Sequence, residues 1–306
     1  MMNIQEFTQK ACTEIAKALG CEVQYKEVEK LNGAKHYGLI ILEPGNNVAP
    51  TLYLEPFFDM YLHTKNWKGT VDRIIRAYQA DSFPKRLDMG WFKDFEKVRG
   101  LIFHKLVNFE ANTELLEDIP YTRYLDFAII YCIYYKDDEI GSGSILIHNS
   151  HLEAWGCTTQ DLARLAEENT PRIFPLAIST MGNVLRECLG DMEDLPPDEE
   201  DIPAPMYIMT NEAKTNGAIT ILYPNALKNL ADRIHSDVVI LPSSVHEVIL
   251  LPLQRDHNVK ELRDAVYEIN RRELDREDFL SDNVYLYRRD TGSIEIADGG
   301  SFDGKE

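Results

Sequence analysis

The segment from Leu125 to Tyr135 constrains the fold of this chain more than any other. Its sequence, LDFAIIYCIYY, is rich in β-branched and aromatic residues and places apolar side chains on both faces of an extended strand. A strand that is apolar on both faces is typical of the centre of a sheet, where neighbouring layers cover it from two sides. The chain must therefore fold around a central strand with packed layers above and below it.

The first hundred residues predict a small unit of helices and antiparallel strands. Apolar residues recur at three-and-four spacing over 3–19, which predicts a helix that ends at Gly20. An Asn-Gly pair at 32–33 predicts a hairpin, and residues 51–58 are expected to add a third strand. Thr70 is expected to cap a following helix.

The remainder of the chain alternates strands and helices in mixed order. The glycine-rich run 141–144 predicts a hairpin turn, and an Asn-Gly pair at 216–217 predicts a second one. Helix caps are expected at Thr158, with Asp161 three residues on, and at Asn258. Strands are predicted at 102–109, 125–135, 144–148, 206–210, 218–223, 237–241 and 246–253, helices at 158–168, 225–234 and 259–269, and a hairpin through 290–292.

This order predicts an α+β fold with mixed, largely antiparallel sheets and packed helices, arranged as two units. We expect an N-terminal α+β unit over residues 1–100 and a C-terminal α+β unit over 101–306. Within the second unit, residues 191–201 contain seven acidic residues and two prolines, which predicts an acidic loop at about 190–205.

The charge of the chain excludes some partners and favours others. With 32 Lys and Arg against 51 Asp and Glu residues, the formal net charge is -19. Direct binding of nucleic acid or of an anionic membrane draws its affinity from Lys and Arg, so neither is expected. An acidic surface favours a basic protein partner instead. The longest apolar run, Phe127 to Tyr135, is far shorter than the roughly 20 residues that a membrane helix needs.

The five cysteines indicate a reducing compartment. They are odd in number and form no C-x-x-C pair, which is typical of a cytoplasmic protein without disulfides. The N-terminal residues lack the basic start and the apolar core of a signal peptide. We therefore expect a cytoplasmic protein, and no residue pattern argues for a particular oligomeric state.

Hydroxyl, imidazole and carboxylate groups come together in the segment 241–247. Ser243, Ser244, His246 and Glu247 are the candidate catalytic residues, with serine as nucleophile, histidine as base and glutamate as orienter. Side chains two apart on a strand stand about 7 Å apart, however, whereas a nucleophile and its base must approach to about 3 Å. The alternative is a turn whose hydroxyls bind backbone groups, followed by a strand.

A ligand pocket beside this segment would use Asn211, Asn216 and Tyr223. No metal site is predicted, because the histidines are scattered and neither H-E-x-x-H nor C-x-x-C occurs. No cofactor is expected either, since both the P-loop pattern and the G-x-G-x-x-G pattern are missing.

Several stretches together resemble a bacterial family, domain of unknown function 5688. They are YLEPFFDMY at 53–61, NFEANTELLEDIPYTRYLDFAIIY at 108–131, LEAWG at 152–156, MYIMTNEAKTNGAITILYPNALKNLA at 206–231, LPSSVHEVILLP at 241–252 and LSDNVYLYRRDTGSIEIA at 280–297. Residues 122–253 are also similar, more faintly, to domain of unknown function 1444. The first resemblance implies a bacterial cytosolic protein, and it implies no reaction, cofactor or catalytic residue.

Two functional hypotheses follow. The first is a non-catalytic interaction or regulatory protein whose acidic surface meets a basic partner, with a nucleic-acid mimic as a sharper version. The second is a hydrolase or a small polar ligand binder that uses the segment 241–247.

Overall fold

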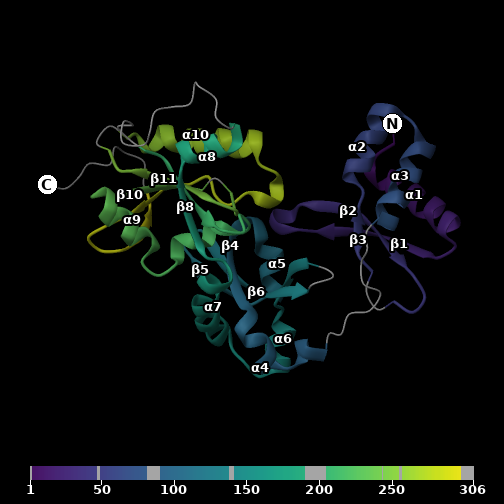
Figure 1. The fold of residues 1–306 in the computed structure, drawn as a ribbon, viewed down its shortest axis with the longest axis horizontal. Coiled ribbons are helices and arrows are strands. Elements are labelled where there is room, and N and C mark those ends of the chain that lie inside the picture. Colours follow the sequence, from purple (N-terminus) through teal and green to yellow (C-terminus); the bar gives the residue numbers. More distant parts are fainter. Residues whose placement is uncertain are drawn as a thin grey trace. The chain divides into compact units, whose positions relative to one another are not determined.

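The computed structural model describes residues 2–46, 49–80, 90–137, 141–189, 205–242, 244–254 and 257–297 (Figure 1). The chain divides into two compact units. The smaller unit contains residues 1–93 together with 135–143, and the larger one contains 94–134 and 144–306. Both combine helices with antiparallel sheets, so the fold class is α+β, as the sequence predicts.

The smaller unit is a three-stranded antiparallel sheet with helices against its apolar face. Strands β1 (Glu22–Glu29), β2 (Lys35–Leu42) and β3 (Thr51–Tyr53) pair in that order, and the one-turn helix η1 (Leu31–Gly33) closes the first hairpin. Helices α1 (Ile4–Leu19), α2 (Glu55–Thr64) and α3 (Trp67–Ala80) supply the rest of its core, and η2 (Gly90–Lys93) follows. The predicted first helix and its end at the left-handed Gly20 are confirmed.

Two predictions for this unit are wrong. The third strand ends at Tyr53, and α2 begins at Glu55, because Pro56 suits the first turn of a helix, where its missing N–H costs no hydrogen bond. Thr70 lies inside α3 and donates its hydroxyl to the carbonyl of Asn66. The side chain of Asn66 instead accepts the N–H of Gly69 at the start of that helix.

A four-stranded sheet surrounds the strand that the sequence singles out. β6 (Phe127–Asp137) pairs with β4 (Ile102–Asn108) on one edge and with β5 (Tyr121–Tyr124) and β7 (Gly141–Leu146) on the other, which confirms its central position. Helix α7 (Thr159–Ile173) packs against β4, and the predicted cap at Thr158 with Asp161 is present. The short helices here are α4 (Phe95–Val98), η3 (Arg99–Leu101), η4 (Glu110–Asn112), α5 (Thr113–Asp118) and α6 (Asn149–Trp155).

A six-stranded sheet forms the other half of the larger unit, with strand order β13-β12-β10-β11-β9-β8. These strands are β8 (Leu176–Thr180), β9 (Tyr207–Asn211), β10 (Val238–Leu241), β11 (Val248–Pro252), β12 (Tyr285–Tyr287) and β13 (Ile294–Ile296). The helices between them are α8 (Met181–Leu189), η6 (Gly217–Leu222), α9 (Ala226–Ile234), α10 (Val259–Glu273) and η7 (Arg276–Asp278). Asn258 caps α10, as predicted.

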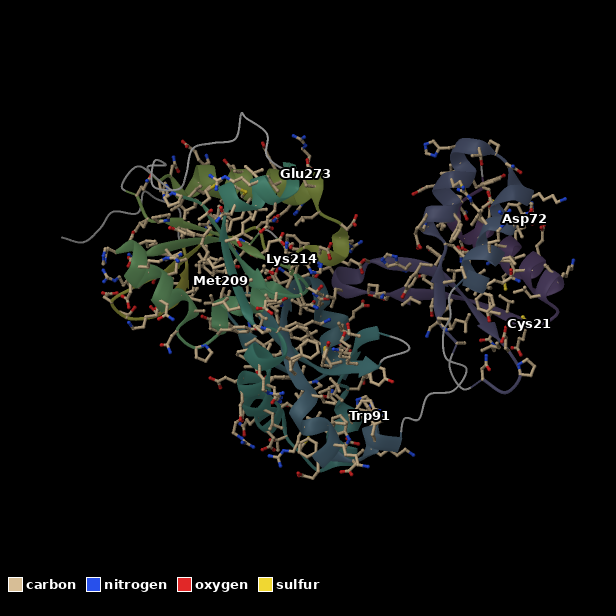
Figure 2. The ribbon with its side chains drawn as sticks, viewed as in Figure 1. Cys21, Asp72, Trp91, Met209, Lys214 and Glu273 are labelled. Atoms are coloured by element: carbon tan, nitrogen blue, oxygen red, sulfur yellow. The ribbon has the colours of Figure 1, made fainter. Side chains whose placement is uncertain are left out.

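The six-stranded sheet is covered on both faces. Val239 and Leu286 face α10, whereas Ile240 and Tyr285 face a core that includes α9, η6 and residues of the four-stranded sheet (Figure 1). Met209 is completely buried in this second core and lies among its dense side chains (Figure 2). The larger unit therefore has its main core between the two sheets.

Two further predictions for this unit are wrong. Residues 217–222 form η6 instead of a strand, because Asn216 adopts a left-handed conformation and the N–H of Ala218 donates to the carbonyl of Val245. The run 141–144 belongs to strand β7 instead of a turn. The acidic loop predicted at about 190–205 falls on residues that lie almost entirely outside the described part of the chain.

Candidate functional site

Three of the four candidate catalytic residues lie in the turn that leads into β11. Ser243 lies outside the described residues. The expected strand begins at Val248, so His246 and Glu247 precede it. The backbone N–H of Val245 donates to the carbonyl of Asp278 over 2.9 Å, and the carbonyl of Val245 accepts from the N–H of Ala218 over 3.1 Å. The turn is therefore fixed to η7 on one side and to η6 on the other.

Both nitrogens of the His246 ring have hydrogen-bond partners within the protein. Nδ1 accepts the backbone N–H of Asn216 over 3.1 Å, which requires Nδ1 to be unprotonated. Nε2 then carries the proton and donates it to Oδ1 of Asp278 over 3.0 Å. The two contacts thereby fix the imidazole in a single tautomer. A ring in this state has no free nitrogen with which to accept a proton from a substrate.

Ser244 is not arranged as a nucleophile. Its side-chain oxygen accepts the backbone N–H of His246 over 3.0 Å and lies 3.4 Å from Oε1 of Glu247. The residue is only 3% exposed. Because the histidine ring has other partners, the serine hydroxyl lacks the histidine base of the predicted arrangement. The three side chains build a hydrogen-bonded turn, which agrees with the alternative interpretation of the segment.

Asn211 and Asn216 do come together with this turn. The amide of Asn211 donates to the carbonyl of Thr215 over 2.8 Å and so shapes the loop that carries Asn216. The hydroxyl of Thr210 donates to the carbonyl of His246 over 2.7 Å. These contacts connect β9 and the loop after it to the start of β11. The two asparagines thus shape the backbone around the imidazole.

No contact between Tyr223 and the other candidates is observed among the described residues. Its hydroxyl donates to the carbonyl of Phe174 over 2.9 Å, at the end of α7. Burial raises the pKa of Tyr223, so the phenol stays neutral at physiological pH. Tyr223 therefore attaches η6 to α7, and only its ring reaches the pocket described next.

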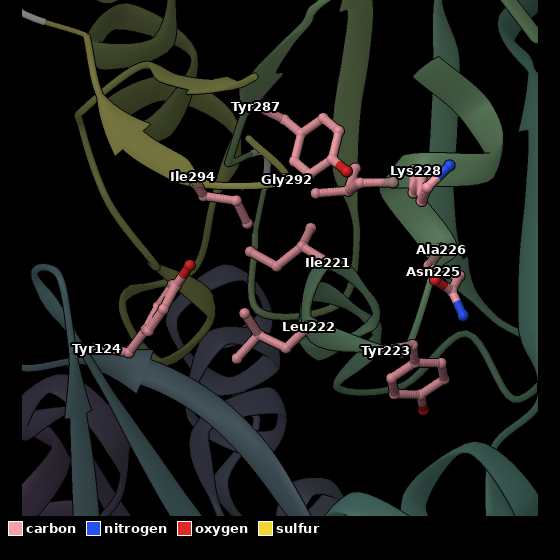
Figure 3. A pocket seen from close by; sticks show the side chains of 11 residues that line it. Tyr124, Ile221, Leu222, Tyr223, Asn225, Ala226, Lys228, Tyr287, Gly292 and Ile294 are labelled. Atoms are coloured by element: carbon pink, nitrogen blue, oxygen red, sulfur yellow. The ribbon is translucent and has the colours of Figure 1, made fainter. Parts of the chain in front are cut away.

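A pocket of about 320 Å³ opens between η6, α9, the β12–β13 hairpin and the end of β5 (Figure 3). Ile221 and Leu222 line it, together with Ile294 of β13. Polar groups come from Tyr124, Asn225, Lys228 and Tyr287. The volume lies at the lower end of the range of about 300–1,000 Å³ that is typical of small-molecule sites.

Sequence reasoning identified only Tyr223 among the residues that line this pocket. Tyr124 and Tyr287 are separated by more than half of the chain, and no spacing rule connects them. The one local signal is the spacing of Lys228 and Asp232, which places an acid one helical turn after a base and is typical of an exposed helix face.

The neighbouring histidines His148 and His151 do not form a metal site. Nδ1 of His148 bonds to Oδ2 of Asp118 over 2.7 Å, and Nδ1 of His151 accepts the backbone N–H of His148. Burial and the neighbouring His148 lower the pKa of His151. In the parts of the chain that the structure describes, no group of three or more His, Cys, Asp or Glu side chains is arranged to hold a metal ion.

Exposed acids lie on η4, on α5 and on the neighbouring α6. The amide of Asn149 donates to the carbonyl of Glu117, so the start of α6 lies against the end of α5. All the acids concerned are exposed, and only Asp118 has an ion-pair partner within the described residues, namely His148. We call this set the acidic face, and it comprises Glu110, Glu114, Glu117, Asp118 and Glu153.

Across the described residues, no helix is long and apolar enough to cross a membrane.

Comparison with known proteins gives one match. The model of a family of unknown function, DUF5688, matches residues 4–289. No curated protein and no solved structure matches significantly. The match supports the first of the two resemblances seen in the sequence and does not bear on the similarity to domain of unknown function 1444. Because the family model spans almost the whole chain, the protein belongs to the DUF5688 family.

Proposed function

We propose that this protein is a non-catalytic interaction protein whose larger unit binds a basic protein partner. The distribution of charge carries the proposal. Residues 1–93 contain 12 Lys and Arg against 11 Asp and Glu, whereas residues 94–306 contain 20 Lys and Arg against 40 Asp and Glu. The excess of acid thus belongs to one part of the chain. General solubility would be served equally well by acids spread over both parts.

The acidic face supports a specific location for this binding. Glu114, Glu117 and Asp118 follow the i, i+3, i+4 spacing that places side chains on one side of α5, and Glu110 precedes them in η4. The sequence stretches 106–122 and 137–163, which supply the face, contain no Lys or Arg. A lysine- or arginine-rich segment of a partner would meet these carboxylates without competition from bases of the same stretches.

The hydrolase alternative has less support. A serine nucleophile needs a base with a free nitrogen, whereas both ring nitrogens of His246 have partners.

The finer proposal of a bacterial cytoplasmic location rests on the cysteines and on the family resemblance. Cys12, Cys21, Cys132 and Cys157 are free thiols, as expected in a reducing compartment.

The test is a titration of the full-length protein with a fluorescent Lys/Arg-rich peptide, followed by anisotropy at low and high salt. The test variant carries Glu110→Gln, Glu114→Gln, Glu117→Gln and Glu153→Gln. The control variant carries Glu22→Gln, Glu29→Gln, Asp59→Asn and Asp72→Asn, which are exposed acids of the smaller unit and remove the same formal charge.

We expect the acidic-face variant to bind the peptide about tenfold more weakly, and the control variant to bind it as the unmodified protein does. Added salt should weaken binding to the unmodified protein. Equal losses in both variants would mean that only total charge matters and would overturn the location. Failure of the unmodified protein to bind would overturn the proposal itself.

A nucleic-acid mimic is a more specific form of this proposal. A capture experiment with the same protein tests it. Immobilised protein would capture partners from host lysate, and duplex DNA would then be added as a competitor. Release of the captured protein by DNA supports mimicry, whereas retention against DNA and release by salt support an ordinary basic partner.

A further inference from the structure

Two segments meet at the ring of His246, and the turn that carries this residue is the more firmly held of the two. Ser244 and Val245 are buried, and the backbone of Val245 is bonded both to η7 and to η6. The carbonyl of His246 also accepts the hydroxyl of Thr210 over 2.7 Å. The turn is therefore a fixed support for the imidazole.

The loop 212–216 on the other side of the ring is held less firmly. Its first four residues are exposed, and the ion pair of Lys214 with Glu187 spans 3.9 Å between two exposed side chains, so it contributes little. Lys214 and Asn216 both have left-handed backbone conformations, with φ values of 51° and 52°, which are less favourable for most residues other than glycine. Specific hydrogen bonds, and not burial, therefore keep this loop in place.

Two side chains bond to the end of the loop. The side chain of Asn211 bonds to the backbone of Thr215 at 2.8 and 3.4 Å, and Nδ1 of His246 accepts the N–H of Asn216 over 3.1 Å. An amide does not titrate, whereas the ordinary charge change of an imidazole falls between pH 5 and pH 8. Of these bonds, only the one to His246 can therefore respond to pH.

Protonation of the ring is incompatible with the bond to Asn216. An imidazolium ion is a donor at both nitrogens, so a protonated Nδ1 would direct its N–H at the N–H of Asn216. Nε2 keeps its bond to Asp278, and the positive charge strengthens that bond. Because the turn and the carboxylate hold the ring where it is, the loop is the side that moves.

Asp278 is the one charged residue that bonds to the ring within the described part of the chain. Of the packed elements, η6 contributes no titratable group, and β9 contributes only Tyr207, which is buried in the core between the two sheets. The other charged residues of the surrounding segments are Glu212 and Lys214 in the loop, Glu247 in the turn, and Arg276 and Glu277 in η7. A carboxylate in direct contact with the ring thus favours its protonated form.

We propose that His246 is an acid-sensitive switch that releases the loop 212–216 from the turn before β11. While Nδ1 is unprotonated, it holds the backbone of Asn216. Once the ring takes up a proton, it stays with Asp278, and Asn216 moves away. This response does not depend on the binding proposed for the acidic face.

The experiment measures amide hydrogen exchange in the full chain by NMR between pH 8 and pH 5, corrected for the intrinsic effect of pH on exchange. The imidazole resonances of His246 report its protonation in the same samples. His246→Gln removes the titrating group, and Asp278→Asn removes the carboxylate that favours the protonated ring. The matched controls are His235→Gln at the exposed end of α9 and Asp275→Asn, an exposed acid next to η7.

We expect the protection of the Asn216 amide to fall at least about tenfold over this range, in step with protonation of His246, because one linked proton changes the equilibrium by up to about tenfold per pH unit. The amides of β6 should stay protected, since one loop opens and the unit does not unfold. His246→Gln should remove the pH dependence, and Asp278→Asn should move the midpoint of the opening about one pH unit lower. Both controls should behave as the unmodified protein does.

Three results would overturn the proposal. Constant protection of Asn216 while the ring takes up its proton would show that the loop does not respond to His246. The same pH dependence in His246→Gln would assign the response to another group. Loss of protection in β6 at the same pH would indicate unfolding of the whole unit. If His246→Gln does not fold, Asp278→Asn decides, because an unchanged midpoint would contradict the role of the ring.

Discussion

The backbone N–H of Asn216 donates to Nδ1 of His246 over 3.1 Å across a separation of 30 residues. This bond fixes the imidazole tautomer and connects the loop after β9 to the turn before β11. The proton on the opposite nitrogen then meets Asp278 of η7. The loop after β9, the turn before β11 and η7 are thus held together at the ring of His246. These contacts predict that His246 has a structural role.

Replacement of His246 by alanine should lower the free energy of unfolding of the larger unit by about 1–3 kcal/mol, because two part-buried hydrogen bonds are lost. A double-mutant cycle with Asp278→Ala isolates the contact between the two side chains, and we expect a coupling of about 1 kcal/mol. Urea unfolding measures each variant. Additive losses would show that His246 and Asp278 do not interact.

Gly217 must be a glycine for a steric reason. A Cβ atom at this position would lie 2.4 Å from the carbonyl oxygen of His246 and 2.9 Å from the backbone nitrogen of Asn211. Backbone atoms cannot move aside as the end of a side chain can, so Gly217→Ala should destabilise the larger unit by several kcal/mol, on the order of an overpacked core. Gly100→Ala meets no atom within 4 Å and is the control. Equal stability of the two variants would contradict the close approach.

Local patterns predict much of this fold. The apolar run of β6, the capping box at Thr158 and the cap at Asn258 are properties of short stretches, and each element forms where its stretch predicts it. The run 217–222 fails as a prediction because its residues are typical of a strand. What decides its conformation is contact with β9, which precedes it by one short loop, and with the turn at 245–246, which is remote in sequence.

The candidate sites depend even more than the fold does on contacts between residues that are distant in sequence. The hydroxyl, imidazole and carboxylate groups of the segment 241–247 can be read directly from the sequence. The hydrogen-bond partners of His246, however, come from the distant residues Asn216 and Asp278. The pocket combines Tyr124, Lys228 and Tyr287 from three elements. No periodicity or spacing within one stretch brings these residues together, and only the folded backbone places them around one volume.

His104 makes the stability of the larger unit sensitive to acid. It is buried in β4, and burial lowers its pKa from about 6.5 to about 4. A histidine with a lowered pKa in the folded state contributes stability above pH 6.5, and this contribution is lost as the pH falls towards 4 because the unfolded chain binds the proton first. The loss amounts to about 3 kcal/mol.

The measurement is urea unfolding at neutral pH and at several acidic pH values, for the unmodified protein and for His104→Leu. The variant should lose distinctly less stability between pH 7 and pH 4, whatever its stability at neutral pH. His235→Asn, at the exposed end of α9, is the control and should follow the unmodified protein. Parallel curves for His104→Leu and the unmodified protein would contradict a buried, neutral His104.

Cys132 should be the slowest of the described cysteines to react. It is 1% exposed on β6, and burial raises the pKa of its thiol, so little thiolate forms. Alkylation by iodoacetamide, followed by mass spectrometry of peptides, should label the half-buried Cys21 at least about tenfold faster, since Cys132 reacts only when β6 opens. Similar rates would indicate that the centre of this sheet opens readily. Addition of urea should remove the difference.

Asp126 connects the β5–β6 hairpin to the chain just before β12. Its Oδ1 accepts the hydroxyl of Tyr285 over 2.6 Å, and its Oδ2 accepts the hydroxyl of Ser281 over 2.7 Å and the amide of Asn283 over 3.0 Å. Burial and the carboxylate together raise the pKa of Tyr285, so the phenol remains a donor. One carboxylate therefore satisfies three donors, two of which belong to almost completely buried residues.

Asp126→Ala should therefore destabilise the larger unit far more than the removal of an exposed carboxylate does. The substitution leaves the donors of Ser281 and Asn283 without their acceptor and leaves the hydroxyl of Tyr285 with only Oγ of Ser281, and we expect a loss of about 3–5 kcal/mol in the free energy of unfolding. Asp118→Ala, whose side chain is 73% exposed, is the control and should cost less than about 1 kcal/mol. Urea unfolding followed by tyrosine and tryptophan fluorescence measures both. If Asp126→Ala is as mild as the control, water must replace the carboxylate between the two sheets, and the connection contributes little to the fold.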